Sequence, residues 1–204
     1  EGLPARVETL ERLPGLAAWV RVLDHREQQI RGLKNVEVAM ESPMEVDDII
    51  GSGFEHVVVA TGARWRADGI GRWHLTPVPT VGSLPVLTPD DLMSGERPSG
   101  PRVVVFDDDH YYMGGVLSEL LAAEGYDVQL VTPAAQVSSW TNNTLEIIRI
   151  QERVLNAGVQ VRTARTLTAM GDGEVTLACA YTGREEAVPA DAVVMVTARL
   201  PRDE

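Results

Sequence analysis

One strand–turn–helix–strand unit restricts the fold of this chain to a small set. Residues 103–106 form a short apolar run that passes directly into a turn, and a helix then opens at Gly114. A second apolar run, residues 127–131, follows Gly125. This is the order of a dinucleotide-binding βαβ unit, in which a glycine-rich turn lets the backbone approach a pyrophosphate at the helix N-terminus.

The turn, however, has the wrong chemistry for a phosphate. Three aspartates occupy it, and their carboxylates would repel the ligand. A carboxylate at a helix N-terminus has a structural use, because it accepts backbone N–H bonds. Consecutive residues seldom converge on one metal ion, so this structural interpretation is favoured over a metal site. We therefore predict a vestigial nucleotide turn without a metal, made of Asp107, Asp108, Asp109, Gly114 and Gly115.

Two neighbouring features also oppose a dinucleotide. Tyr111 and Tyr112 are expected to fill the space that a pyrophosphate needs. After the second strand, where an acid would bind the ribose hydroxyls or an arginine a 2′-phosphate, the chain has Thr132 and Pro133. We predict that this domain binds neither NAD(H) nor NADP(H).

The elements after residue 102 predict an α/β domain with the Rossmann-like FAD/NAD(P)-binding fold. Strands and helices are expected to alternate at 102–107, 114–124, 127–132, 143–157 and 159–163, with Asn143 capping the second helix. Antiparallel strands follow at 166–170, 174–178 and 185–189, and a buried closing strand at 191–198. We expect a mostly parallel sheet with helices on both faces and a small antiparallel layer, all within residues 102–204.

The first block, residues 1–80, predicts part of another such domain, of the ADP/FAD-like kind. A helix beginning near Leu16 should cover one face of a sheet that contains strands at 36–40 and 55–63. The opening glycine-rich turn of such a domain is missing, so an exposed apolar surface is expected. Residues 81–101, rich in Pro, Gly and Ser, are predicted to be a crossover linker.

Composition excludes several classes of function. A net charge of −12 argues against nucleic acid and anionic membranes as partners, and no apolar run is long enough to span a bilayer. The single cysteine, Cys179, excludes a disulfide framework and a cysteine cluster, and it is expected to be a buried, inert thiol. The N-terminus shows no signal peptide and reads as a cut inside a longer protein, which predicts a cytoplasmic setting.

Several motifs together resemble a known family. The Ala-Thr-Gly motif at 60–62 and the segment DAVVMVTARLP at 191–201 resemble the closing motifs of the two nucleotide domains in two-domain flavoproteins. More specific are three segments: LPGLAAWVRV (13–22), VVVFDDDHYYMGG (103–115) and VSSWTNNTLE (137–146). They resemble the C-terminal nucleotide-domain region of the trimethylamine, dimethylamine and histamine dehydrogenase family, which is related to Old Yellow Enzyme.

The resemblance implies a parent amine dehydrogenase, an oxidoreductase whose N-terminal TIM barrel carries FMN and a 4Fe–4S cluster. In that family the first nucleotide domain holds ADP, which places Thr61 and Gly62 near its ribose and pyrophosphate and Met44 near its adenine. The chain itself would have no catalytic residue, would be inactive alone, and would act as a scaffold with a partial ADP site. Its implied partner is the barrel of its own polypeptide, and a homodimer is expected.

Two other functions remain open from the residues. The chain could be the NAD(P)H-binding portion of a flavin-dependent enoate or dienoyl-CoA-type reductase, in which the second domain delivers hydride. The aspartates of the turn oppose that alternative, because glycines would be needed there. The chain could also be an interaction module that kept the fold and lost its ligands.

Overall fold

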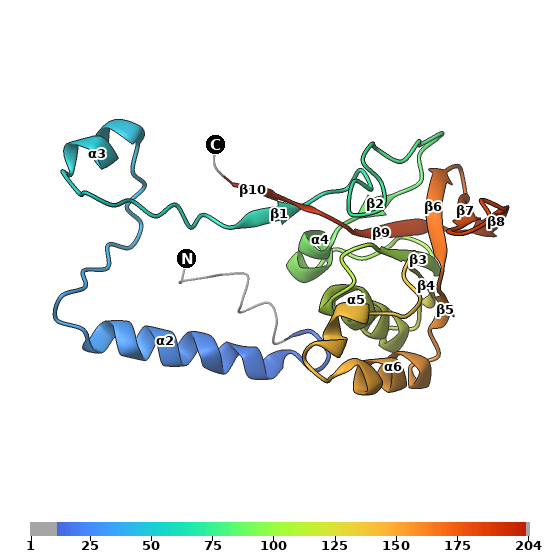
Figure 1. Cartoon of the computed structure of the whole chain (residues 1–204), viewed down its shortest axis with the longest axis horizontal. Helices are drawn as coiled ribbons and strands as arrows, with labels where there is room; N and C mark the ends of the chain where they lie inside the picture. The colour runs from blue at the N-terminus through green and yellow to red at the C-terminus, as the bar shows by residue number, and fades with distance from the viewer. Residues whose placement is uncertain (1–11, 203–204) are drawn as a thin grey trace.

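A five-stranded parallel sheet organises the second half of the chain. The computed structural model describes residues 12–202, and the sheet has the order β2-β9-β3-β4-β5 (Figure 1). Its strands are β2 (Val86–Leu87), β3 (Arg102–Asp107), β4 (Asp127–Val131), β5 (Gln160–Arg162) and β9 (Ala192–Val196). On β3, Val104 lies opposite Gln129 of β4 and Val193 of β9, both in parallel pairing. The predicted fold class is confirmed.

The central strand β3 is apolar because both of its faces are covered. Val103 and Val105 pack in one hydrophobic cluster, whereas Val104 and Phe106 pack in another on the opposite face. All four side chains are at most 1% exposed. A parallel strand buried on both sides reads as a continuous apolar run, which explains the sequence of residues 103–106.

The two faces of the sheet have different covers. Helices α4 (Pro89–Ser94), α5 (Tyr112–Ala123) and α6 (Ile147–Asn156) contribute to the cluster on one face. An antiparallel sheet covers the other face with the strands β6 (Arg165–Met170), β7 (Glu174–Cys179) and β8 (Glu185–Pro189). The predicted antiparallel layer is therefore confirmed. The expectation of helices on both faces was wrong, because apolar residues of β6 to β8, such as Leu167 and Leu177, bury the second face.

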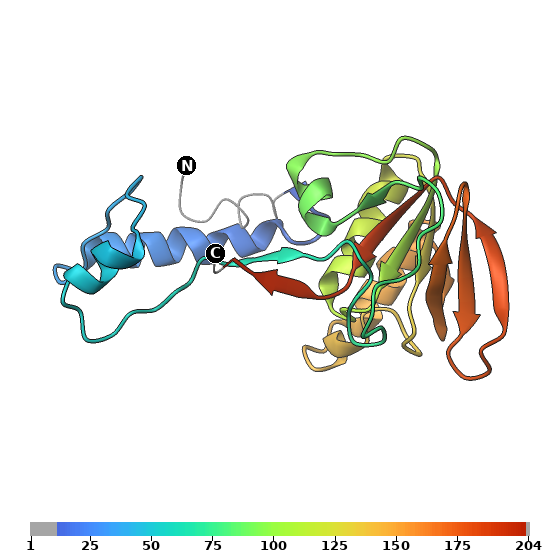
Figure 2. The same cartoon turned by 90° about the horizontal axis from the view of Figure 1, so that it is seen from above.

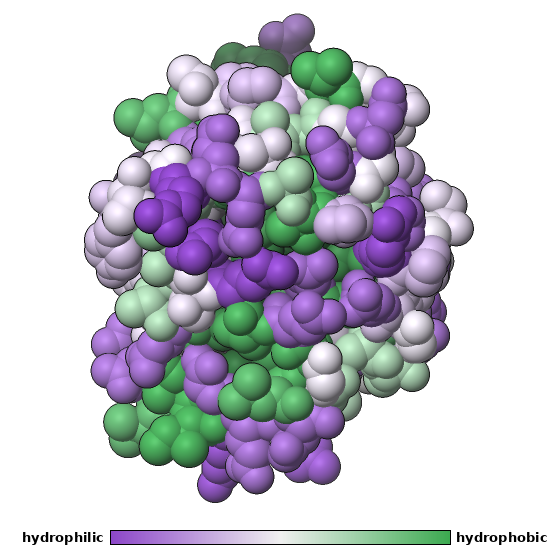
Figure 3. Space-filling model, turned by 90° about the vertical axis from the view of Figure 1, so that its right-hand side faces the viewer, coloured by the Kyte–Doolittle hydropathy of each residue, from purple (hydrophilic) through white to green (hydrophobic). Residues whose placement is uncertain are grey.

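The outer side of the antiparallel layer is hydrophilic. Glu186 on β8 forms ion pairs with Arg162 of β5 (3.3 Å) and Arg165 of β6 (3.2 Å). Figure 3 views this end of the molecule and shows hydrophilic residues over much of it, with hydrophobic residues gathered in the lower part. The layer thus presents one apolar face to the sheet and one polar face to solvent, as antiparallel sheets commonly do.

The helix expected at 143–157 begins later. A short 3₁₀ helix, η3 (Ser139–Asn142), precedes it, and α6 starts only at Ile147. Leu145 between them has a φ of 61°, a left-handed conformation that interrupts a right-handed helix. The predicted cap at Asn143 was therefore wrong: Glu146 is the N-cap residue, and it makes no side-chain capping bond.

The segment expected to be a linker contains regular structure. Thr88 and Asp91 form a capping box at the start of α4, with Pro89 in the first turn. This Thr-Pro-Asp-Asp sequence is a helix-start signal that the compositional argument overlooked. The strand β2 before it pairs with β9 and extends the parallel sheet.

Residues 17–62, here called the arm, extend away from the sheet (Figures 1 and 2). The arm contains the short 3₁₀ helix η2 (Ala17–Trp19) and the helices α2 (Val20–Gly32) and α3 (Val46–Gly51), and none of the three has a buried residue. The predicted exposed apolar surface is present. Its large apolar side chains are Trp19, Val22, Leu33, Val36, Val38, Met40, Met44, Val46, Ile50, Phe54, Val57, Val58 and Val59.

The strands expected in the arm do not form. Residues 36–39 and 57–62 have no strand assignment, and Val58 is 86% exposed where a buried strand was expected. A strand needs a neighbour to satisfy its backbone groups, and no described residue pairs in a sheet with residues 36–39 or 57–61. For the same reason α2 covers no sheet face. Only the end of the expected strand 55–63 is paired: Ala63 lies opposite Pro201, and the carbonyl of Gly62 accepts the N–H of Arg202. The division into domains at 80 and 101 stays a prediction.

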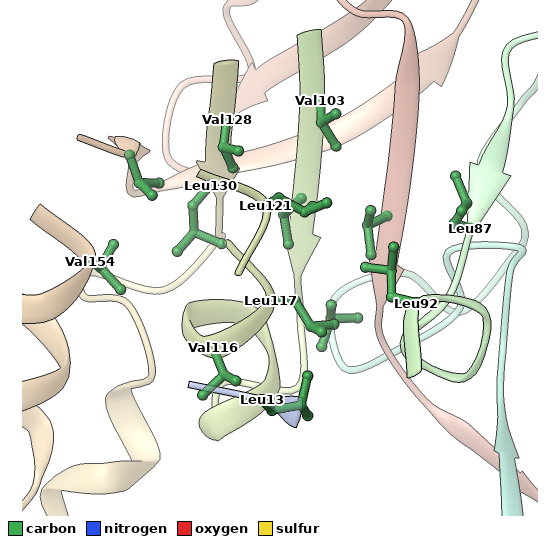
Figure 4. Packing of buried hydrophobic residues seen from close by; sticks show 14 of the residues in the cluster. Leu13, Leu87, Leu92, Val103, Val116, Leu117, Leu121, Val128, Leu130 and Val154 are labelled. Atoms are coloured by element: carbon green, nitrogen blue, oxygen red, sulfur yellow. The ribbon is translucent and has the colours of Figure 1, made fainter. Parts of the chain in front are cut away.

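The segment before the arm is anchored in the other half of the chain. Leu13 and Leu16 are 3% and 8% exposed and belong to the cluster that contains Val116 and Leu117 of α5 (Figure 4). The helical segment does begin near Leu16, as predicted: Leu16 is the N-cap residue of η2, which runs directly into α2, while its side chain is buried in the core cluster. No helix in the described part of the chain is long and apolar enough to cross a membrane.

This anchoring predicts that the same Leu→Ala substitution lowers the free energy of unfolding by different amounts at Leu13 and at Leu33. Leu13→Ala should lower the free energy of unfolding by about 2–5 kcal/mol, because it leaves a cavity in the core. Leu33→Ala, at a side chain 49% exposed on the arm, should change it by less than about 1 kcal/mol. Chemical denaturation of the 204-residue chain measures both. Equal effects would show that the segment at Leu13 is not part of this core.

Candidate functional site

The acidic turn, residues 107–110, lies at the carboxyl end of the central strand. In open α/β sheets ligands bind at this edge, outside the carboxyl ends of the strands. Here the edge is filled by buried polar side chains: Asp107 and Asp108 are at most 1% exposed, and Asp109 and His110 at most 9%. No group of three His, Cys, Asp or Glu side chains between residues 12 and 202 is arranged to hold a metal ion.

Asp107 occupies the backbone donors of its own turn. Its Oδ1 accepts the N–H of Asp109 at 3.2 Å and the N–H of His110 at 3.0 Å. Donors at this position, between the strand and the first helical turn, are those that hold a phosphate in a nucleotide site. The carboxylate therefore replaces the ligand with an internal acceptor.

The two glycines predicted for the turn lie in the first turn of α5, which begins at Tyr112 rather than Gly114, and they have separate packing roles. A Cβ added at Gly114 would lie 2.4 Å from Cγ of Asp107, so only glycine lets the buried carboxylate lie against α5. A Cβ at Gly115 would lie 3.2 Å from Oγ of Ser138 and 3.3 Å from Cγ2 of Ile150. Gly115 thus permits close packing of α5 on η3 and α6.

The other two carboxylates bind segments from elsewhere in the chain. Oδ2 of Asp108 accepts the backbone N–H of Trp73 at 2.7 Å. Oδ1 of Asp109 accepts a hydrogen bond from Nη2 of Arg199 at 3.2 Å. Sequence reasoning could not find Trp73 and Arg199, because they lie 35 and 90 residues away in the chain.

His110 completes the turn in a strained conformation. Its φ of 61° is uncommon for a residue other than glycine. Its Nε2 lies 3.2 Å from Oδ1 of Asp108, and its Nδ1 lies 3.3 Å from the hydroxyl of Thr132 at the end of β4. Thr132, the residue at which a nucleotide domain would contact the ribose, therefore contacts His110 of the acidic turn instead.

The tyrosines do not fill the phosphate position. The hydroxyl of Tyr112 donates to the carboxylate of Glu146 and lies 3.3 Å from Oγ1 of Thr144, on the side of α6. Burial and the hydrogen bond to Glu146 raise the pKa of Tyr112 to about 12. Tyr111 packs edge-on against the ring of Tyr112. The expectation for these residues was wrong, because Asp107 rather than a tyrosine takes the donors.

Burial is the largest cause of a raised pKa at Asp107. Loss of water raises the pKa of this carboxyl to about 7, although the N–H of His110 and the charge of that residue act in the opposite direction. Its Oδ2 is buried and has no hydrogen-bond partner. The folded state therefore retains a proton on Asp107 at pH values where the unfolded chain has lost it.

Asp107→Asn should remove a pH dependence of stability. Because the folded pKa is raised, the contribution of Asp107 falls as pH rises from about 4 to about 7, by on the order of a few kcal/mol. The variant should thus gain stability relative to the parent chain over this range, as measured by urea unfolding at several pH values. Asp191→Asn is the control: hydrogen bonds from Arg102 lower the pKa of Asp191 to about 2, so its contribution to stability has the opposite sign, changes only below about pH 5 and is constant from about pH 5 to about pH 7. A parallel pH profile for Asp107→Asn and the parent would contradict the assignment.

The residues predicted to meet ADP lie on the arm. The hydroxyl of Thr61 donates to the carbonyl of Arg202, and the carbonyl of Gly62 accepts the N–H of Arg202 at 3.0 Å. Gly62 has a φ of 84°, and a Cβ added there would meet no atom within 4 Å. Met44 is 53% exposed and precedes α3 by two residues. In Figure 1, α3 lies at the far end of the arm from the strand β1 (Ala63–Trp65) that follows Gly62. Thr61 and Gly62 therefore both contact Arg202, whereas Met44 lies on another part of the arm.

Cys179 differs from its expected state. It is partly exposed and lines a shallow cavity of about 430 Å³ with Arg165, Thr182, Arg184, Glu185 and Glu186. Hydrogen bonds from the Thr182 side chain and from the backbone of Tyr181 and Thr182 lower the pKa of this thiol to about 7. The prediction of a buried thiol was wrong, because Cys179 lies at the end of β7, where its side chain is partly exposed beside the β7–β8 turn.

Comparison with known proteins identifies the family. Residues 87–186 match the model of the OYE-like second alpha/beta domain. The chain is 33% identical over 178 residues to dimethylamine dehydrogenase of Hyphomicrobium sp. (strain x), covering 84% of this chain and 24% of that protein. Histamine dehydrogenase from Rhizobium sp. 4-9 is 48% identical, with a TM-score of 0.91 over 100% of this chain and 32% of its own. The chain belongs to the trimethylamine, dimethylamine and histamine dehydrogenase family.

A further solved member supports the same assignment. The 6-hydroxypseudooxynicotine amine oxidase from Pseudomonas geniculata N1 is 42% identical, with a TM-score of 0.89 over 98% of this chain and 30% of that one. The chain thus spans about a quarter to a third of the length of these relatives. The resemblance inferred from its motifs is confirmed.

The acidic turn predicts that this member of the family binds no NADH or NADPH at its second domain. The turn donors are already bonded to Asp107, and a nearby like charge adds a cost on the order of 1 kcal/mol. Titration calorimetry at low salt should show no specific heat with either nucleotide. Micromolar binding that disappears in Gly114→Leu would contradict this prediction.

Proposed function

We propose that the chain is the nucleotide-domain portion of a longer amine dehydrogenase, an oxidoreductase that carries FMN and a 4Fe–4S cluster. The observation that carries this proposal is the match to histamine dehydrogenase over the whole chain, the arm included. An arm with its apolar side chains in solvent would be unfavourable in a protein that ended there. It is favourable where the rest of a longer polypeptide covers it.

In this proposal the chain is a non-catalytic scaffold. The FMN and the cluster belong to a barrel domain outside these residues, because one cysteine cannot supply a cluster of the kind that four thiolates hold. The barrel of the same polypeptide is the main partner, and the complete protein is a cytoplasmic homodimer. The 204-residue chain alone has no dehydrogenase activity.

The arm would supply part of an ADP site. Thr61 and Gly62 are the residues assigned to this role, and the backbone at Gly62 fits it in two respects. The backbone at Gly62 is open to close approach, and its positive φ favours glycine. Met44 would reach the adenine only after the arm packs on the missing part of its domain. The alternative of a hydride-delivering NAD(P)H domain is not favoured, since relatives that are 33%, 48% and 42% identical carry the names of amine dehydrogenases and an amine oxidase.

The proposal predicts a division of activity between the complete protein and this chain. The complete protein should contain FMN and reduce an artificial electron acceptor with at least one of histamine, dimethylamine or 6-hydroxypseudooxynicotine. The isolated chain should contain no flavin and show no turnover. Flavin absorbance and steady-state acceptor reduction measure both. An isolated chain that retains flavin or oxidises an amine would overturn the scaffold assignment.

Matched glycine variants of the complete protein test the ADP site. Gly62→Ala should lower the ADP released on denaturation severalfold while FMN content stays unchanged, because its Cβ would enter the space of the nucleotide. Gly53→Ala is the control, since Gly53 also has a positive φ (71°) and no atom within 4 Å of an added Cβ. Equal ADP content in both variants would exclude Gly62 from the site.

A further inference from the structure

Residues 66–74, here called the strap, cross the edge of the sheet where a dinucleotide would lie. The strap begins beside the segment after β9, where the N–H of Arg66 donates to the carbonyl of Ala198 at 3.0 Å. Its Trp73 N–H reaches the acidic turn. The guanidinium of Arg72 lies 4.7 Å from the ring centre of Trp140 on η3. The strap thus spans the N-terminus of α5 from one side to the other.

Gly71 fits the strap to the turn. A Cβ added there would lie 2.3 Å from Oδ2 and 3.1 Å from Cγ of Asp108. Gly71 is not among the residues with positive φ, so its backbone does not require glycine. Its small size is explained by the close approach to the buried carboxylate.

A two-stranded ribbon is bound to the same turn. The strands β1 (Ala63–Trp65) and β10 (Arg199–Pro201) pair antiparallel and run between the arm and the sheet (Figures 1 and 2). Arg199 donates to Asp109 and also lies 4.5 Å from the ring centre of Trp65. The N–H of Trp65 in turn donates to Oδ2 of Asp90 on α4, at 2.9 Å. Asp90 of α4 and Asp109 of the acidic turn therefore bind one strand of the ribbon each.

Each aspartate has a different partner. Asp107 holds the turn, Asp108 holds the strap and Asp109 holds the ribbon. The bond to Asp108 is the strongest tie to another segment, because a buried carboxylate accepts it. The pair of Arg199 and Asp109 is weaker alone, since the arginine side chain is 49% exposed.

We propose that the acidic turn is an intramolecular latch that fixes the orientation of the arm relative to the sheet. It binds the strap and the ribbon at the position where a nucleotide domain binds its dinucleotide. The ribbon is where the chain passes between the two parts, so holding it limits their relative rotation. The aspartates are required for this contact, because a glycine-rich turn would offer the strap no acceptor for the N–H of Trp73.

Amide hydrogen exchange on the complete protein that contains this sequence tests the latch. Gly71→Ala should push the strap off Asp108, and Arg199→Gln should release the ribbon. If the contacts act together, Arg199→Gln raises exchange at least tenfold at Trp73, which Arg199 does not touch. Gly71→Ala likewise raises exchange at residues 199–201.

Two matched variants serve as controls. Asp172 accepts the N–H of Ser83 at 2.8 Å, and a Cβ at the neighbouring Gly82 would lie 2.1 Å from its Oδ1, which is the same arrangement at another place. Asp172→Asn should leave exchange at the strap unchanged. Gly32→Ala on α2, with no atom within 4 Å of an added Cβ, should do the same.

The outcomes separate a latch from independent local bonds. Increases confined to the substituted segment, or equal increases in Asp172→Asn, would overturn the proposal. Should Gly71→Ala fail to fold, Asp109→Asn preserves side-chain shape and removes only the charge that holds Arg199. Faster exchange at Trp73 in that variant supports the latch, and unchanged exchange at Trp73 contradicts it.

Discussion

The buried carboxylate of Asp107, bonded to the N–H groups of residues 109 and 110, is the contact on which the site depends. Once an internal acceptor takes these donors, the turn has no donors left there for a phosphate. Glycine at position 114 makes room for the Asp107 carboxylate, and His110 adopts a positive φ in the same turn. An aspartate at the end of β3 thus accepts, within the fold itself, the backbone N–H groups that a nucleotide domain offers to a phosphate.

The next two aspartates extend this change to the rest of the chain. A carboxylate buried without a partner is costly, so Asp108 and Asp109 persist only with partners supplied by the strap and the ribbon. Those partners come from segments that connect the arm to the sheet. The acidic turn at the end of β3 thus contacts both segments that connect the arm to the sheet.

The arm shows that a strand-like sequence pattern does not by itself form a strand. Residues 36–40 and 57–60 alternate or run apolar as strands do, yet they lie in solvent, because no neighbouring strand exists among the described residues. Its conformation still matches that of a much longer relative. The arm thus has strand-like sequence patterns without strands among the described residues, and its exposed apolar residues form a surface that the rest of the proposed longer polypeptide would bury.

The sequence by itself determined the order of elements after residue 102, the parallel pairing of β3 with β4 and the antiparallel layer, because apolar runs, glycine turns and the βαβ rule act locally. It also identified the unusual turn and, through its motifs, the family. Only the tertiary structure decided which face the antiparallel layer covers, that Leu13 and Leu16 fill the core beside α5, and which groups neutralise the aspartates. The last of these outcomes depends on Trp73 and Arg199, which lie 35 and 90 residues from the aspartates that they contact. Pairing between such distant residues leaves no periodicity that a single sequence can reveal.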